Sequence, residues 1–233
     1  MKHGPLIFLG LLITMGWSWF GLIFTPYRHT VAMTPDTNQI TQAVYPFQRN
    51  GLARKGAEVY RANGCYACHT QQVRSEGQGN DQQRGWGTRH TVAKDFLYED
   101  VAMTGSQRLG PDLANVGARI PDANWHLLHL YNPKIKVPKS NMAPYPYLFE
   151  KRKAGTEASN ALQIPPAFAP KDGSVIVPTP EAVALVAYLL SLNASTPVFE
   201  APPKTNAAPS INTNAPTATL TNAPAGASNA VPQ

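Results

Sequence analysis

The pentapeptide Cys65-Tyr-Ala-Cys68-His69 constrains this chain more than any other feature of its sequence. Two thiols at this spacing can each add to one vinyl group of a haem, and the adjacent histidine is then delivered to the iron. They are the only two cysteines among 233 residues, which excludes a disulfide framework and leaves a zinc ribbon without its second pair. No strand–motif–helix context typical of thioredoxin-like redox pairs surrounds them. The motif therefore predicts one covalently bound haem c on Cys65, Cys68 and His69, and single-electron transfer as its use.

The sixth iron ligand is predicted from the methionines that follow the motif. Methionine raises the reduction potential of a haem, and only Met103 and Met142 are available. Met142 lies in SNMAPYPYL, where prolines stiffen the chain and reduce the entropy lost on placing a thioether. Met103 lies in a helical-looking stretch that favours a core or surface position. We predict Met142 as the ligand; the rivals His126 and His129, which share one helical face, are expected to be hydrogen-bonded or haem-edge residues.

The N-terminal run Pro5–Phe24 carries no charged side chain over 20 residues. A helix of this length, at about 1.5 Å per residue, spans the hydrocarbon core of a bilayer, which is about 30 Å thick. A cleaved signal peptide would have a shorter apolar core and a small-residue cleavage site, which residues 25–27 do not provide. We therefore predict a retained transmembrane anchor over residues 1–27. Because c-type haems are attached outside the bacterial inner membrane, the haem domain is expected in the periplasm.

Composition divides the rest of the chain into three parts. Residues 28–50 are polar and interrupted by prolines, which predicts an extended periplasmic stalk with little structure. Residues 51–200 are assigned to the haem domain, with residues 150–178 as a surface insertion. Residues 201–233 consist mostly of Ala, Pro, Asn and Thr, a composition that cannot bury a core, and are predicted to be disordered.

Two segments of the haem domain show the apolar spacing of helices, residues 52–63 and 180–192. The second starts with Thr179 as the predicted cap and Pro180 in the first turn. Gly56 lies on the inward face of the first segment. A glycine inside a helix costs stability, so Gly56 indicates either a close approach by another helix or a tolerated position near the helix start. The connecting regions are rich in glycine, proline and polar residues and predict long irregular loops.

The overall charge limits the partners of the chain. The net charge is +6, and no basic stripe is interleaved with stacking aromatic residues, so nucleic acid is not an expected partner. The positive charge instead suits an acidic protein face or anionic lipid.

The order of these features resembles the class I cytochrome c fold. The helix GAEVYRANG, the CYACH motif, the segment GPDLANVGAR, a methionine loop and the helix VAYLLSL follow one another as in that fold. The resemblance implies a mainly α haem domain with long irregular loops, in which the first and last helices cross. It also implies that Pro111 offers its backbone carbonyl to His69, which fixes the orientation of the imidazole.

A longer match is more specific than the haem motif. The tracts CYACHTQQVR and RLGPDLANVGARIPDANWHLLHLYNPKIKVPKSNMAPYPYL resemble the mono-haem subunit of cbb3-type cytochrome c oxidases. The resemblance covers residues 1–149 and the helix near 180–192, and leaves 150–178 and 201–233 outside its pattern. It implies Met142 as axial ligand, with the haem–copper catalytic subunit and a di-haem cytochrome subunit as partners. The oxygen chemistry would then belong to another chain.

Two alternatives stay open besides an oxidase subunit. One is a free-standing, membrane-tethered electron carrier, and the other is the cytochrome c subunit of a nitric oxide reductase. The long Trp-His-x-x-His segment argues against the reductase subunit, which is shorter and lacks it. Three arginines, Arg74, Arg108 and Arg119, are candidates for pairing with the haem propionates, and the sequence does not rank them.

Overall fold

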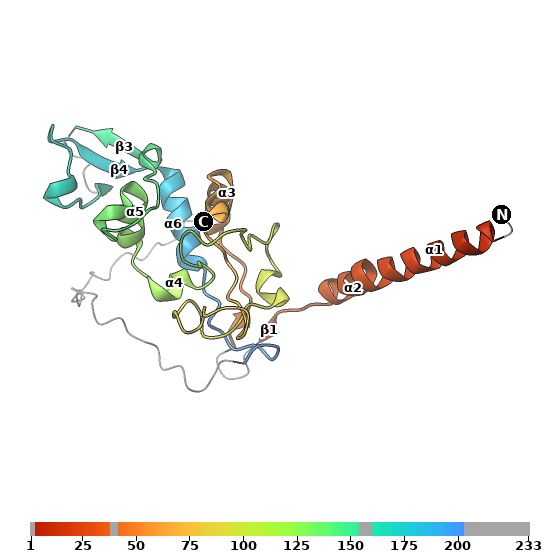
Figure 1. The fold of residues 1–233 in the computed structure, drawn as a ribbon. Helices are drawn as coiled ribbons and strands as arrows, with labels where there is room; N and C mark the ends of the chain where they lie inside the picture. The colour runs from red at the N-terminus through yellow and green to blue at the C-terminus, as the bar shows by residue number, and fades with distance from the viewer. Residues whose placement is uncertain (1–2, 38–41, 154–159, 203–233) are drawn as a thin grey trace, which may run out of the picture.

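The computed structural model describes residues 3–37, 42–153 and 160–202, and helices with long irregular connections dominate it (Figure 1). Most of residues 42–202 form a domain, from which one helix projects. This architecture confirms the predicted mainly α fold with a single N-terminal apolar helix. Most of the predicted disordered tail, residues 203–233, lies outside the described residues.

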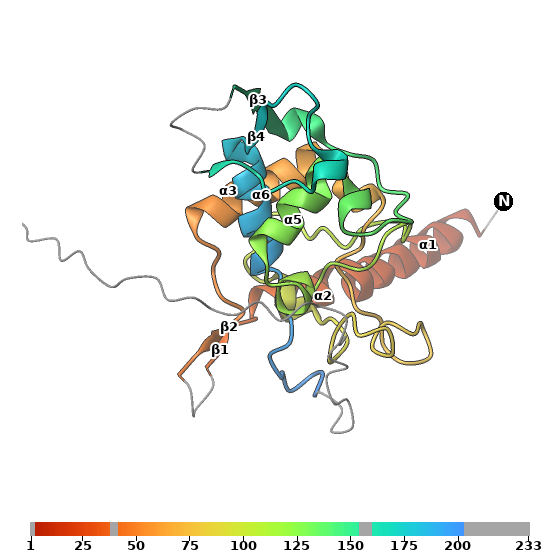
Figure 2. The same ribbon diagram turned by 90° about the vertical axis from the view of Figure 1, so that its left-hand side faces the viewer.

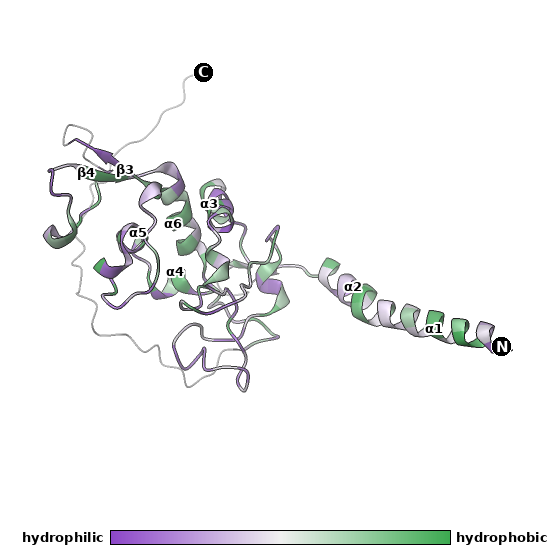
Figure 3. Ribbon diagram, turned by 45° about the horizontal axis from the view of Figure 1, so that its top comes forward, coloured by the Kyte–Doolittle hydropathy of each residue, from purple (hydrophilic) through white to green (hydrophobic). Residues whose placement is uncertain are grey.

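The projecting helix is continuous from Gly4 to Val31. It comprises α1 (Gly4–Trp19), a π-helical turn (Phe20–Phe24) and α2 (Thr25–Val31). Pro26 has no backbone N–H and cannot continue the regular hydrogen-bond ladder, which explains why the wider turn directly precedes it. The helix is apolar, is not buried against the domain, and is long enough to cross a membrane (Figure 3).

The stalk with little structure predicted over residues 28–50 contains the end of the anchor helix and one short strand pair. The anchor helix extends to Val31, beyond the predicted boundary at residue 27. Strands β1 (Asp36–Thr37) and β2 (Val44–Tyr45) then pair antiparallel, and Tyr45 is buried. The polar composition of the segment gives no sign of the buried Tyr45 ring.

Helices α3 (Gly51–Ala62) and α6 (Pro180–Ser191) cross each other and form the centre of the domain (Figure 1). A Cβ atom on Gly56 would lie 1.9 Å from the carbonyl oxygen of Ala184. The close-approach interpretation of Gly56 is therefore correct, because no other residue leaves room for the two backbones.

Both helices start at side-chain caps. The Asn50 side chain accepts a hydrogen bond from the Ala53 amide, and the Thr179 hydroxyl accepts one from the Ala182 amide. Each cap satisfies an amide that the helix itself leaves unpaired. The predicted start of the last helix at Thr179 and Pro180 is confirmed.

Two shorter helices, α4 (Val116–Arg119) and α5 (Ala123–Tyr131), pack on α6 and close the core. A Cβ atom on Gly117 would lie 2.1 Å from the carbonyl oxygen of Leu190, so α4 also approaches α6 closely. Single turns of 3₁₀-helix lie between these elements, at Cys65–Ala67, Ala93–Phe96, Pro133–Ile135, Pro146–Leu148 and Pro166–Phe168.

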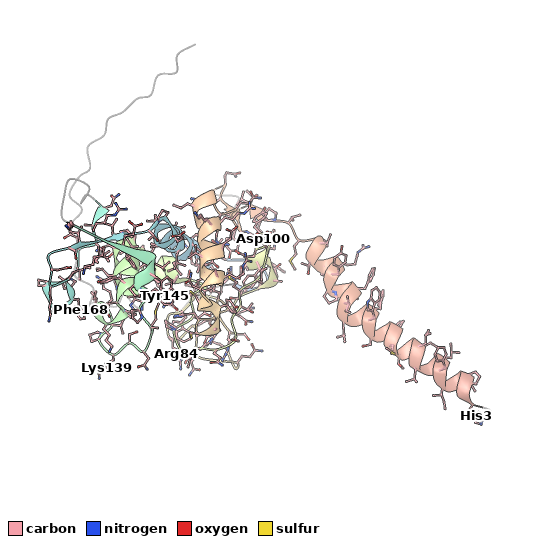
Figure 4. All side chains as sticks on the ribbon, turned by 90° about the horizontal axis from the view of Figure 1, so that it is seen from above. His3, Arg84, Asp100, Lys139, Tyr145 and Phe168 are labelled. Atoms are coloured by element: carbon pink, nitrogen blue, oxygen red, sulfur yellow. The ribbon has the colours of Figure 1, made fainter. Side chains whose placement is uncertain are left out.

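Residues 150–178 are more than a surface insertion, which corrects the sequence prediction. Strand β3 (Phe149–Arg152) pairs antiparallel with β4 (Val175–Pro178). Leu162 and Ile176 are buried in the same cluster as the core of the helical domain. Strand β4 contacts α6, and the Phe149 ring lies 5.3 Å from the ring of Tyr131 in α5, so the hairpin covers one end of both helices. Phe168 lies on this part of the domain, far from the anchor helix (Figure 4).

The buried side chain of Arg89 holds the segment between the anchor helix and the domain in place. Arg89 is 2% exposed and binds both carboxylate oxygens of Asp95, at 3.0 and 2.7 Å. It also donates to the Tyr45 hydroxyl at 3.1 Å and to the Thr196 carbonyl at 2.7 Å. The β1–β2 hairpin and the chain after α6 thus meet at the same end of the domain (Figure 2). Ala201, at the start of the predicted tail, is buried there beside Tyr45.

Replacing Tyr45 by Phe should loosen this attachment without emptying the small core around it. The variant removes a hydroxyl that donates to Asp95 at 2.8 Å and accepts from Arg89. We expect a loss of about 1–2 kcal/mol in local stability, because two buried charged groups lose a partner. Limited proteolysis should show faster cleavage between residues 32 and 44, whereas the same change at exposed Tyr98 should not.

Candidate haem site

The haem motif follows directly from the end of α3. Gly64 has a φ of 66°, in the left-handed region that glycine adopts without strain, and it ends the helix. A single turn at Cys65–Ala67 follows, in which the amides of Cys68 and His69 donate to the Cys65 carbonyl at 3.2 and 3.0 Å. This turn brings both thiols and the imidazole to one place. Cys68 is exposed, and burial raises the pKa of the Cys65 thiol to about 11, so this sulfur is uncharged at neutral pH.

The imidazole of His69 is oriented by the backbone opposite it. Its Nδ1 lies 2.8 Å from the carbonyl oxygen of Pro111. A carbonyl oxygen can only accept a hydrogen bond, so Nδ1 carries the proton. The other ring nitrogen, Nε2, is then the one available to a metal. Burial lowers the pKa of His69, which favours the neutral form that a metal ligand needs.

Gly110 makes this approach possible and was not identified from the sequence. A Cβ atom at Gly110 would lie 2.2 Å from Cε1 of His69, so any side chain would displace the ring. The Gly110 amide also donates to the Cys68 carbonyl at 3.0 Å, which ties the two segments together. The Gly-Pro dipeptide was the available signal, since it marks a turn where backbone can come close.

The structure distinguishes the three candidate arginines for a haem propionate. The side chain of Arg74 is exposed, and all three nitrogens of Arg108 are bound by protein groups. Arg119 donates to the Asp112 carbonyl at 2.5 Å, but its Nε is buried and has no partner among the described residues. Such an orphaned donor is costly unless another group binds it.

The residues present therefore fit a haem. One region of the domain contains the groups that a haem requires. They are two thiols, an imidazole with a free Nε2, a glycine that leaves room for the ring, and a buried unpaired guanidinium nitrogen.

The two candidate methionines have different surroundings. Met103 is 7% exposed and belongs to the main core, which is one of the two positions predicted for it, but it lies outside any helix. Met142 is only half-buried and lies outside regular helix, and its amide donates to the Ser140 hydroxyl at 3.2 Å. Cys65, Met142 and Tyr145 all pack against the same core cluster. Met142 as axial ligand remains a prediction.

The two rival histidines are held differently. His126 is 4% exposed, and its Nε2 lies 2.8 Å from the Ile120 carbonyl oxygen, so this nitrogen carries the proton. His129 stacks on the ring of Trp125, with centroids 4.8 Å apart, and its buried Nδ1 has no hydrogen-bond partner among the described residues. His126 is hydrogen-bonded as expected, and the expectation that His129 is not an iron ligand remains a prediction.

The model of the family described as cytochrome c oxidase, mono-heme subunit/FixO matches residues 29–170. This match covers more than half of the chain. The chain belongs to the FixO family. A search of curated proteins found no match. The FixO match continues to residue 170, so most of the 150–178 segment belongs to the family pattern, contrary to the sequence prediction.

In this FixO-family protein, acid should destabilise the fold through His129. Burial is the main cause that lowers the pKa of His129 from 6.5 to about 4. Above pH 6.5 the residue is neutral whether folded or unfolded. As the pH falls towards 4, the unfolded chain binds a proton that the folded chain does not, and stability is lost. After allowance for partial exposure we expect about 2 kcal/mol.

Denaturant unfolding at pH 7 and pH 4.5 would measure this loss. The variant His129→Gln should show a smaller decrease in unfolding free energy between the two pH values. An identical decrease in both proteins would contradict the assignment to His129.

Proposed function

We propose that this chain is a membrane-anchored mono-haem cytochrome c that relays electrons to the haem–copper catalytic subunit of a cbb3-type terminal oxidase in aerobic respiration. The observation that carries the proposal is the 2.8 Å contact between His69 Nδ1 and the Pro111 carbonyl oxygen, beside the Cys-x-x-Cys-His motif. A histidine fixed in this way presents one defined nitrogen to iron. Membership in an oxidase mono-haem subunit family supports the partner.

Each residue of the site has a separate role in the proposal. A bound haem c supplies a site that takes up and releases one electron. Cys65 and Cys68 would hold it through thioethers, and His69 and Met142 would bind its iron. Arg119 would offer its buried Nε to a propionate. An iron bound by both side chains would have no site for a substrate, so the proposed role of this chain is electron relay, with oxygen reduction in another chain.

The proposed location follows from the helix and the cofactor together. The apolar helix Gly4–Val31 anchors the chain in lipid of the bacterial inner membrane. The haem domain is placed in the periplasm, where c-type haems are attached. The proposed protein partners are the haem–copper catalytic subunit and the di-haem cytochrome subunit of the oxidase.

Purification in mild detergent tests the proposal. The full chain should stain for haem after denaturing electrophoresis, and a double Cys65→Ala, Cys68→Ala variant should not. It should also co-purify with a multi-helix haem–copper subunit that reduces oxygen. Extraction of the haem protein alone would favour a free-standing carrier, and co-purification with a nitric oxide-reducing subunit would favour the reductase alternative.

A further inference from the structure

A fully buried carboxylate lies directly behind the proximal histidine. Asp112 is 0% exposed and follows Pro111 in the chain. Its Oδ2 accepts hydrogen bonds from the Thr70 hydroxyl at 2.5 Å and from the Gln72 amide at 2.8 Å. Its Oδ1 accepts from the Ala114 amide at 2.8 Å. Because burying a charge is costly, three bonds of this quality indicate a group that the local structure depends on.

Arg108 forms a second layer over this carboxylate. Its Nε donates to the Thr70 hydroxyl at 2.8 Å, and a second nitrogen donates to Asp81 at 2.6 Å. The third donates to the Gln72 carbonyl at 2.5 Å and lies 3.6 Å from Asp112. Asp81 is itself buried. One guanidinium therefore serves two buried carboxylates.

This cluster joins the two segments that meet at the proximal ligand. Thr70 is the neighbour of His69, and Asp112 is the neighbour of Pro111, so their short bond closes a bridge beside the His69–Pro111 contact. The Leu113 amide also donates to the Thr70 carbonyl at 2.7 Å. A shift of either segment would have to break several buried charge-assisted bonds.

The charge of the cluster acts on the same site. Asp112 directly follows Pro111, whose carbonyl oxygen lies 2.8 Å from His69 Nδ1, so this buried carboxylate lies close to the proposed iron ligand. A ferric haem carries one more positive charge than a ferrous haem. A buried negative charge therefore stabilises the ferric form, and a buried positive charge stabilises the ferrous form.

We propose that Asp112 and Arg108 are positioning residues that hold Pro111 against His69 and set the haem reduction potential in opposite directions. Asp112 lowers the potential, and Arg108 raises it. The inference rests on the proposed function only in requiring a haem on His69.

Redox titration of the full haem-bound chain in detergent tests this inference. Asp112→Asn keeps the shape of the side chain and removes its charge, and should shift the equilibrium about tenfold towards the ferrous form, or about 59 mV upward. Arg108→Gln should shift it towards the ferric form. The control Asp100→Asn removes an exposed charge on the side of the domain that faces α2 (Figure 4) and should leave the potential unchanged.

Opposite shifts separate an electrostatic role from simple loosening, which would move both variants in one direction. Shifts of the same sign, or none in either variant, would overturn the inference. If Asp112→Asn yields no haem protein, Arg108→Lys replaces it in the comparison. This variant keeps the positive charge, so its potential should stay near the wild-type value while that of Arg108→Gln falls, and an equal fall in both variants would overturn the inference. A wild-type chain that carries no covalent haem would refute the proposed function instead.

Discussion

Replacing Met142 by Leu should remove the low-spin spectrum of a His/Met haem and lower its reduction potential by 0.1 V or more, within the roughly 0.8 V range that axial ligands span. Leucine matches methionine in volume but offers the iron no lone pair. The half-buried side chain should keep its packing against the core cluster, so the fold should lose less than about 1.5 kcal/mol. Absorption spectroscopy and redox titration of the purified chain would measure both effects.

Met103→Leu is the matched control. It makes the same chemical change at a methionine that is 7% exposed within the main core. The spectrum and the potential of this variant should equal those of the wild type. If Met142→Leu keeps an unchanged spectrum, Met142 is not the sixth ligand, and loss of the signal in Met103→Leu would give that role to Met103.

The helices and the haem motif were predictable because their signals are local. Apolar spacing and caps mark α3 and α6 within twelve residues each, and the motif needs only five. For Gly56 the sequence left two interpretations open, and only the structure identifies Ala184 as the close neighbour.

The features that sequence reasoning missed depend on distant partners. Arg89 binds Tyr45 and Thr196, which lie 44 and 107 residues away, and no local pattern distinguishes it from other loop arginines. Strands β3 and β4 are only four residues long each, and the sequence between them predicts no regular structure that would indicate their pairing. The same holds for Asp112, whose role is apparent only when its three hydrogen bonds are known.

Replacing Gly56 by Ala should cost about 3 kcal/mol or more in unfolding free energy, at the upper end of what overpacking costs. The added Cβ would lie 1.9 Å from the Ala184 carbonyl oxygen and 2.7 Å from Cβ of Tyr188. The nearest atom to the added Cβ is a backbone oxygen, so no change of side-chain rotamer can relieve the clash. The helices must separate, and the ring contact of Tyr60 with Tyr188, at 5.4 Å between centroids, would open with them.

Gly51→Ala provides the control within the same helix. A Cβ atom there meets nothing within 4 Å, and alanine favours helix over glycine, so stability should change by less than about 0.5 kcal/mol or rise slightly. Denaturant unfolding of the haem-bound chain would compare the two. Equal stability of the two variants would mean that α3 and α6 do not approach each other at Gly56, and the crossing on which the domain is built would be wrong. A large loss confined to Gly56→Ala would establish that crossing as the packing contact that the rest of the haem domain depends on.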